Sequence, residues 1–223
     1  MASADRIERE RMQKRARILD VARALFVERG VEAVTLREIA QRIEYSTTAI
    51  YMQFADKAAL VEAMLAEDFA AFAQGFEAVA SVEDPVVRLV ALFDAYSDFA
   101  VRMPHHYQLL FLTPAVAEKK PRSGEPTGID GYRVLRATVE ECIRAKRFRA
   151  EVSDVDATAH VIWATVHGLV SLDLVMGRHP QFGWPAREVR ARAHLDMLMH
   201  GLLRDPAEIK RVLARKPARP RKR

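Results

Sequence analysis

The sequence lacks most of the motifs that mark enzyme and metal sites. Its 223 residues include one cysteine, Cys142, so no internal disulfide can form. Paired cysteine ligands, a phosphate-binding glycine loop, a nucleotide-binding glycine pattern and a nucleophile elbow are all missing. Among seven histidines, His160 and His167 lie two helical turns apart, about 10.5 Å, too far to share a metal without other ligands. We therefore expect no enzyme, no cofactor, no catalytic residue and no metal site.

An apolar secretory signal is also missing, because the chain opens with a charged, arginine-rich stretch. Residues 157–176 form the one run near the roughly 20 residues that a membrane-spanning helix needs. His160, His167 and Asp173 interrupt this run, which favours a helix buried on most sides in a bundle. The sequence thus predicts a cytoplasmic protein without a membrane partner.

Basic charge is concentrated near the C-terminus. The formal net charge is +5, and residues 204–223 contain nine Lys or Arg and two acidic residues, a net of +7. The other residues together therefore carry −2. Because the excess belongs to this tail, the net charge alone does not identify a nucleic-acid-binding face. The composition of the tail predicts disorder.

No run of alternating polar and apolar residues reaches strand length, whereas apolar residues recur throughout at the helical period. Half of the residues are hydrophobic (50%), enough for a sizeable core. The predicted fold class is therefore all-α. Caps, glycines and prolines place the helices near residues 5–28, from 35 over two to three turns, 46–52, from 57 onward, 86–102, 105–117, 132–146, 153–176 and 186–203.

Three helices in about the first 56 residues have the dimensions of a helix-turn-helix unit. Thr35 and Glu38 stand in the capping-box relation, and Ser46 is an N-cap for the third helix. Apolar residues that can face a core beneath the first helix are Leu36, Ile39, Ile43, Ile50 and Phe54. Hydrogen-bonding residues remain on or near the outer side, namely Arg37, Thr47, Thr48, Tyr51 and Gln53.

These residues lie in the segments ILDVARALFVERGVEAVTLREIAQRI and STTAIYMQFADKAALVEAML, which resemble the N-terminal pattern of the TetR family of bacterial transcriptional repressors. The resemblance covers about residues 15–65. It implies that Thr35 and Lys57 hold DNA phosphates, with Arg37 as an additional contact. Tyr51 would then pack against the DNA backbone, and Thr47 and Thr48 would reach toward bases. The complete expected DNA-binding set is Thr35, Arg37, Ser46, Thr47, Thr48, Tyr51, Gln53 and Lys57.

Glu44 departs from the family pattern, which usually has glycine at the turn between the two helices. Glycine is favoured there because it accepts a positive φ without steric cost. Glu44 therefore implies either a strained residue or a slightly different turn. Its carboxylate also adds negative charge near the expected DNA surface, which would weaken non-specific affinity.

The second half resembles the effector-binding and dimerisation domain of the same family in architecture. The segment WATVHGLVSLDL is similar to a Trp-His-Gly pattern of one subgroup. By resemblance, residues 153–176 and 186–203 would pair with their copies in a homodimer, with Gly168, Ser171, Leu195, Leu198 and Leu202 at the interface. A pocket for a small, hydrophobic effector is expected to use Phe93, Tyr96, Met103, His106, Tyr107, Phe111, Trp163 and His167.

The expected domain limits are residues 1–14 for an arm or the start of the first helix, 15–60 for the helix-turn-helix, 61–203 for the effector domain and 204–223 for the tail. Five basic residues near the start of the chain either contact phosphates or form a solvated helix face: Arg6, Arg9, Arg11, Lys14 and Arg15. The overall interpretation is a transcriptional repressor, bound to an operator in double-stranded DNA and released by its ligand. The alternative is a helical interaction module without operator binding.

Overall fold

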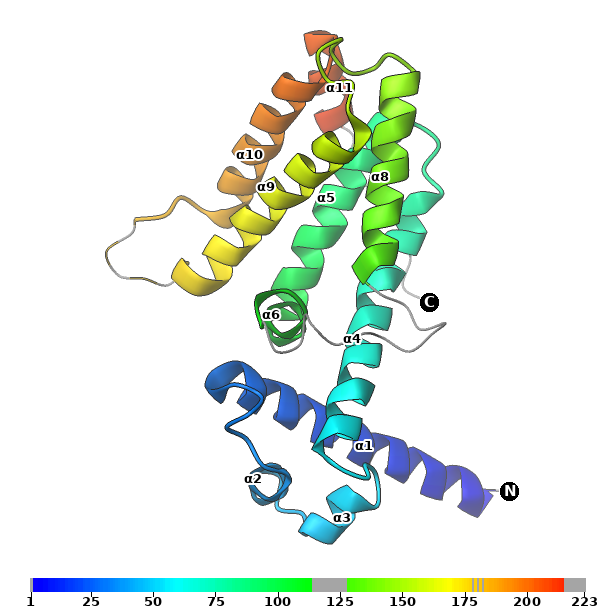
Figure 1. Ribbon diagram of the computed structural model, residues 1–223, viewed down its shortest axis with the longest axis vertical. Coiled ribbons are helices and arrows are strands. Elements are labelled where there is room, and N and C mark those ends of the chain that lie inside the picture. Colours follow the sequence, from blue (N-terminus) through cyan, green and yellow to red (C-terminus); the bar gives the residue numbers. More distant parts are fainter. Residues whose placement is uncertain (1, 114–127, 178, 180, 182, 215–223) are drawn as a thin grey trace. The chain divides into compact units, whose positions relative to one another are not determined.

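The computed structural model describes residues 2–113, 128–177, 179, 181 and 183–214, and these form an all-α fold (Figure 1). No named strand occurs among the described residues, where Phe148 and Leu203 form an isolated β-bridge. The predicted fold class is therefore confirmed. The described chain divides into two compact units, which are considered separately below.

The first unit, within the described residues, comprises 2–70 and 103–113. It contains α1 (Ala2–Arg29), α2 (Leu36–Arg42), α3 (Thr47–Tyr51), the first part of α4 (Lys57–Ala80) and α6 (Pro104–Leu112). Helix α1 packs against α2 and α6, and α2 packs against α3. Gly30 ends α1 at a φ of 83°, as expected for a helix-terminating glycine. The structure thus groups α6 with the N-terminal helices, while the domain limits drawn from the sequence stay a prediction.

The second unit contains the rest of α4, α5 (Pro85–Arg102), α8 (Gly128–Arg144), α9 (Val155–Met176), α10 (Arg187–Leu202) and α11 (Pro206–Ala214). Helix α5 packs against α8, α9 and α11, and α9 also contacts α8 and α10. Asp154 caps α9 by accepting a hydrogen bond from the Ala157 N–H at 2.9 Å. By length and composition, α9 is the one described helix that could cross a membrane. It packs on three other helices, but only Ala159, Ile162, Val166 and Val170 are buried, so the expectation of a helix buried on most sides is wrong.

Helix α11 corrects the expectation of a disordered tail for residues 206–214. Ile209 and Val212 are buried, and the carboxylate of Glu208 pairs with the guanidinium of Arg147. The apolar residues lie one turn apart and therefore share a helical face. This apolar pattern was not recognised from the sequence because basic residues surround it. Residues 215–223 lie outside the described residues.

Candidate nucleic-acid interface and effector site

Helix α2 is held at its start by the predicted capping box. The Thr35 hydroxyl accepts from the Glu38 N–H at 3.2 Å, and the Glu38 carboxylate accepts from the Thr35 N–H at 2.8 Å. Arg29 of α1 also donates to Glu38 at 2.9 Å. Hydrogen bonds from the backbone and hydroxyl of Thr35, together with that from Arg29, lower the pKa of Glu38 to about 2. The carboxylate therefore stays ionised and fixes the α2 start against the end of α1.

The turn between α2 and α3 has a left-handed residue at Glu44, whose φ is 60°. The Tyr45 N–H donates to the Ala40 carbonyl at 2.9 Å, and the Glu44 N–H donates to the Gln41 carbonyl at 3.2 Å. This pair of bonds is a Schellman motif, in which the left-handed position is normally glycine. Of the two alternatives raised by Glu44, the structure thus has the strained residue in an otherwise regular turn.

Helix α3 is capped by Ser46, whose hydroxyl accepts from the Ala49 N–H at 3.1 Å. The predicted inward-facing residues are all buried: Leu36, Ile39, Ile43, Ile50 and Phe54. Their burial fixes the rotation of both short helices about their axes. Consequently Thr48 and Tyr51 are exposed, while Thr47 and Gln53 are half-buried.

The remaining expected DNA-binding residues differ in how readily their side chains can contact a phosphate. Arg37 is exposed on α2. Thr35 donates both its N–H and its hydroxyl hydrogen to Glu38, each at 2.8 Å, so a phosphate contact requires one of these bonds to be released. Lys57 donates to the Glu32 carbonyl at 3.2 Å, and its ammonium has two further hydrogens that can reach a phosphate.

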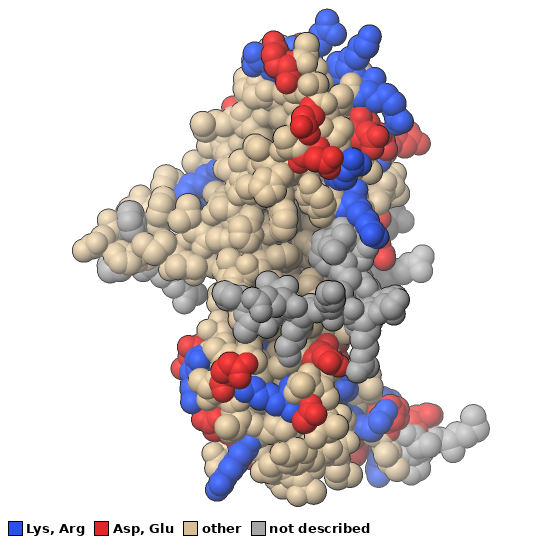
Figure 2. All heavy atoms as spheres, in the orientation of Figure 1, with Lys and Arg blue, Asp and Glu red and all other residues tan. Residues whose placement is uncertain are grey.

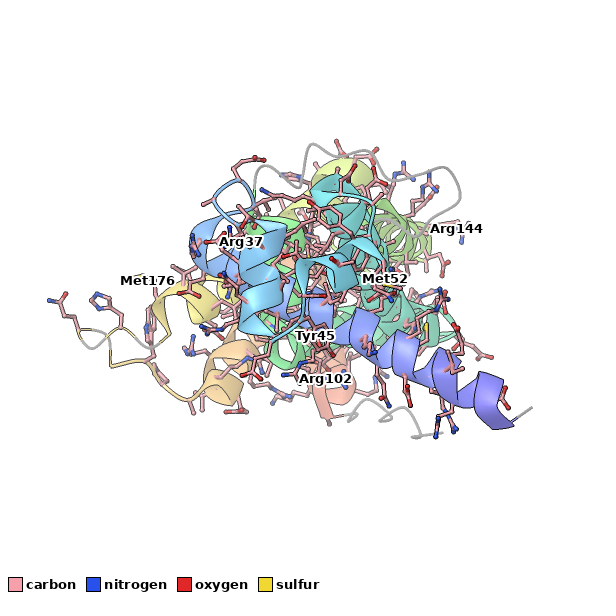
Figure 3. All side chains as sticks on the ribbon, turned by 90° about the horizontal axis from the view of Figure 1, so that it is seen from below. Arg37, Tyr45, Met52, Arg102, Arg144 and Met176 are labelled. Carbon is pink, nitrogen blue, oxygen red and sulfur yellow. The ribbon has the colours of Figure 1, made fainter. Side chains whose placement is uncertain are left out.

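One residue on this surface, Met52, was missed from the sequence. Figure 3 looks onto the helix-turn-helix from below and labels Arg37 on α2, Tyr45 in the turn and Met52 after α3. The Met52 side chain is 80% exposed, and Tyr51 beside it is 55% exposed. An apolar residue exposed next to a reading helix can contact thymine methyl groups or sugars. Its helical register, one position after Tyr51, was the available signal.

The basic residues at the start of α1 do not form one uniform cationic patch. Arg15 lies over the Phe54 ring, 4.8 Å from its centroid, and 3.4 Å from the Glu67 carboxylate, so it supports the fold. Arg11 pairs with Glu8 at 2.9 Å, and Arg6 lies 3.7 Å from Glu10. Acidic and basic groups are interspersed over this unit (Figure 2). These pairs favour the solvated-face interpretation for that part of α1.

The expected effector residues fall into two groups. In the first unit, Tyr107 is fully buried, and His106 lies beside a buried ion pair; Met103 and Phe111 also belong to this unit. In the second unit, the Tyr96 hydroxyl lies 2.9 Å from His167 Nδ1, and Trp163 Nε1–H donates to the same hydroxyl at 3.3 Å. The structure therefore brings Tyr96, Trp163 and His167 together.

The polar groups of Tyr96, Trp163 and His167 form an aromatic cluster that is surrounded by further aromatic rings. Phe72 lies 5.8 Å from the Tyr96 ring, and Tyr132 lies 5.8 Å from the Trp163 ring. Phe93, also expected in the pocket, is buried and packs beside His194 at 5.7 Å. Burial lowers the pKa of His167, which keeps its imidazole neutral near pH 7.

The structure corrects part of the expected dimer interface. Leu195 and Leu202 are only 6% and 7% exposed, because their side chains pack inside their own unit. Gly168, Ser171 and Leu198 are partly exposed. Large apolar side chains are instead exposed along two helix faces: Val161, Leu172 and Val175 on α9, and Val189 and Met197 on α10. The surface over α9 that is visible in Figure 2 is largely uncharged. The spacings of these residues, sums of three and four, were the missed signal.

A capped helix, a tight turn and a second short helix with an exposed polar face, followed by a separate helical unit, define a helix-turn-helix regulator. Residues 18–64 match the tetR family of bacterial regulatory proteins, and residues 89–201 match the Tetracyclin repressor-like C-terminal domain. The chain therefore belongs to the TetR family.

Relatives agree with this assignment. The chain is 33% identical over 108 residues to the HTH-type transcriptional repressor KstR2 of Mycobacterium tuberculosis, covering 48% of this chain and 52% of that protein. It is 31% identical over 109 residues to the HTH-type transcriptional activator FasR of Mycolicibacterium smegmatis, covering 48% and 50%. The chain thus matches about half the length of these curated relatives.

Solved structures share the fold over a longer stretch. The ketosteroid transcriptional regulator KstR2 of Mycobacterium tuberculosis superposes with a TM-score of 0.67 at 22% identity, over 86% of this chain and 96% of that one. FadR from Bacillus subtilis, solved in complex with stearoyl-CoA, superposes with a TM-score of 0.65 at 15% identity, over 83% and 98%.

The strain at Glu44 predicts the effect of its replacement. Glu44→Gly is expected to stabilise the protein by about 1 kcal/mol, because a left-handed conformation costs a residue with a Cβ roughly that amount. Glu44→Gln keeps the strain and removes only the charge, so its urea midpoint should not rise. Both variants should bind random duplex a few-fold more tightly at low salt.

Lys146→Gly is the matched control, since Lys146 has a φ of 53° in an equivalent turn after α8. It should gain similar stability without a change in DNA affinity. Equal midpoints for Glu44→Gly and Glu44→Gln would show that the turn is unstrained.

Proposed function

We propose that the protein is a dimeric transcriptional repressor that binds an operator through α3 and is released by a small hydrophobic effector. The observation that carries this proposal is the rotation of α3, fixed by the buried Ile50, which leaves Thr48 and Tyr51 exposed. Named relatives include a repressor, KstR2, at 33% identity and an activator, FasR, at 31% identity, and the proposal follows the repressor. No catalytic role is proposed for any residue.

In this proposal the contacts divide by their chemistry. Arg37 and Lys57 carry the charges that suit phosphates, and Tyr51 packs against the sugar-phosphate backbone. Thr47, Thr48 and Gln53 supply donors and acceptors toward base edges, with Met52 as an apolar neighbour. Ser46 contributes by capping α3, and Thr35 contributes after releasing one of its bonds to Glu38.

Tyr51→Ala is expected to weaken binding to a selected palindromic duplex at least tenfold. The side chain is mostly exposed, so the free energy of unfolding, measured with urea, should change by no more than about 0.5 kcal/mol. Electrophoretic mobility shift with a duplex that the protein itself selects from a random pool would measure the loss.

Val101→Ala, an exposed apolar residue of α5, is the matched control and should bind normally. If the wild-type protein showed no preference for any duplex over random DNA, the helical interaction module would become the better interpretation. Normal binding by Tyr51→Ala would remove Tyr51 from the interface.

The homodimer is proposed to form through the exposed apolar faces of α9 and α10. Val175 and Met197 are 68% and 75% exposed, an unusual exposure for large apolar side chains on adjacent helices. Gly168 lies partly exposed within the α9 face, and the position that a Cβ would occupy there is open, which permits a close helix approach. A two-fold dimer would present two α3 helices about one DNA turn apart, roughly 34 Å.

Val175→Glu is expected to convert the dimer to a monomer, because an unpaired carboxylate is costly to bury in an apolar interface. Affinity for a palindromic duplex should fall at least tenfold, while helicity is retained. Val101→Glu, which adds the same charge at a half-exposed position of α5, should stay dimeric. Sedimentation velocity would decide the matter, and a dimeric Val175→Glu would place the interface elsewhere.

The effector is proposed to bind at the aromatic cluster of Tyr96, Trp163 and His167. Its hydrogen-bonding groups are neutral, since burial keeps the His167 pKa low. These features favour a neutral, ring-bearing molecule with a polar oxygen. They also support a C-terminal domain of the Trp-His-Gly subgroup.

A neutral steroid ketone such as progesterone is a suitable first probe, because the structurally similar KstR2 is a ketosteroid transcriptional regulator. In a Trp184→Phe background, which leaves Trp163 as the one tryptophan, the probe should change Trp163 fluorescence and raise the melting temperature. Tyr96→Phe should weaken binding about tenfold or less, the effect of one hydrogen bond. Tyr45→Phe should not alter it. Binding of stearoyl-CoA and not of progesterone would contradict the neutral-ligand assignment.

A further inference from the structure

Two of the charged side chains buried among the described residues pair with each other. Arg23 of α1 donates to Asp68 of α4 from Nε at 3.0 Å and from Nη2 at 2.6 Å, and its Nη1 donates to Asp20 at 2.8 Å. His106 of α6 completes the group, with Nε2 3.7 Å from Asp68 Oδ1. Arg23, Asp68 and His106 are called the buried charge cluster below. It joins three helices of the first unit.

The buried charge cluster lies next to two places where the chain passes between the units. The first passage is within α4, between Ala70 and Ala71, and Asp68 lies two residues before it. The second passage is between Arg102 and Met103, and His106 lies three residues after Met103. The first passage is therefore tied to α1 by the Arg23–Asp68 pair, and the second passage begins at α6, which itself packs against α1.

The chemistry of the cluster favours a fixed geometry over added stability. Burial raises the pKa of Asp68 to about 6, against the opposing effect of Arg23, and burial lowers the pKa of His106 to about 4. Near pH 7 the cluster thus holds one ion pair and a neutral imidazole. The cost of removing two charges from water offsets much of their attraction, so such a pair adds little net stability. The forked contact of a guanidinium with a carboxylate is, however, strongly directional.

We propose that the buried charge cluster is a positioning element, which holds α4 and α6 in one orientation on α1 and so fixes how the DNA-reading helices are presented. Arg23 and Asp68 act as positioning residues, since α2 packs on α1 and α3 packs on α2. The proposal rests on the proposed function, because its consequence appears only in a dimer that reads two half-sites. Without the cluster, the helix-turn-helix of each protomer would keep its affinity for a half-site. The spacing between the two helix-turn-helix motifs of the dimer would become variable.

The experiment compares the wild-type protein with two variants on three kinds of DNA. Asp68→Asn removes the carboxylate charge. The paired variant Arg23→Met with Asp68→Leu replaces the ion pair by apolar side chains, and this variant is expected to fold. The DNAs are a palindromic duplex selected by the wild-type protein, a single half-site, and duplexes with one to about five base pairs inserted between half-sites. Five base pairs turn one half-site by about half a helical turn.

The expected result is a wild-type affinity for the single half-site and a loss of at least tenfold on the palindrome in both variants. Tolerance of inserted base pairs should increase, so that the ratio of affinities between the original and the five-base-pair spacer falls toward one. A purely structural role would not widen this tolerance. Glu208→Gln is the matched control, because it alters the pair that the buried Glu208 forms with the half-buried Arg147 in the second unit, and it should keep the wild-type ratio.

Two results would overturn the proposal. In the first, the folded paired variant retains the wild-type preference for the palindrome and for its spacing. In the second, half-site affinity falls by the same factor as palindrome affinity, which would make the cluster a support of the reading unit alone. A wild-type protein that selects no DNA would instead refute the proposed function, and the inference with it.

Discussion

Helices α2 and α3 have seven and five residues, and helices of this length are not stable in water by themselves. They persist because Ile39 and Ile50 are buried against the rest of the first unit, and because α2 packs on both α1 and α3. The reading surface depends on this packing. A helix rotated by one position would bury Tyr51 and expose Ile50, since neighbouring residues on a helix point about 100° apart.

Polar residues near this surface serve the fold before they serve a ligand. The Glu38 carboxylate accepts hydrogen bonds from both donors of Thr35 and from Arg29. The Arg15 guanidinium lies over the Phe54 ring and pairs with the Glu67 carboxylate. Their charges are thereby largely neutralised close to where they lie. The side chains that remain toward solvent are a smaller and more selective set than the basic residues of the sequence. Sequence selectivity in such a set comes from hydrogen-bonding groups and shape more than from net charge.

The second unit combines two features that a purely structural bundle would avoid. One is a pair of adjacent helices with large exposed apolar side chains, and the other is a polar spot of Tyr96, Trp163 and His167 among aromatic rings. The same helix, α9, contributes to both, with Val161 and Val175 outside and His167 within. A change of α9 on effector binding would therefore bear directly on the proposed dimer face. Such a shared element gives two sites a physical means of coupling.

The local pattern of the sequence determined the helices, their caps and the buried face of the helix-turn-helix, because each depends on residues within one or two turns. Thr35 with Glu38, Ser46, Gly30 and Asp154 all act over that range. The left-handed turn at Glu44 was also foreseen as one of two alternatives, since the expected position of glycine was known from the family pattern.

Tertiary structure alone decided the relations that depend on long-range pairing. It paired Arg23 with Asp68 across 45 residues and joined Tyr96 to His167 across 71. It also placed Ile209 and Val212 of the basic tail in the core of the second unit. It also showed that Leu195 and Leu202 belong to the core, whereas Met197 faces outward. An apolar residue on a helix has the same local pattern whether it meets its own domain or another chain. Which of the two it meets is set by the packing of the whole fold.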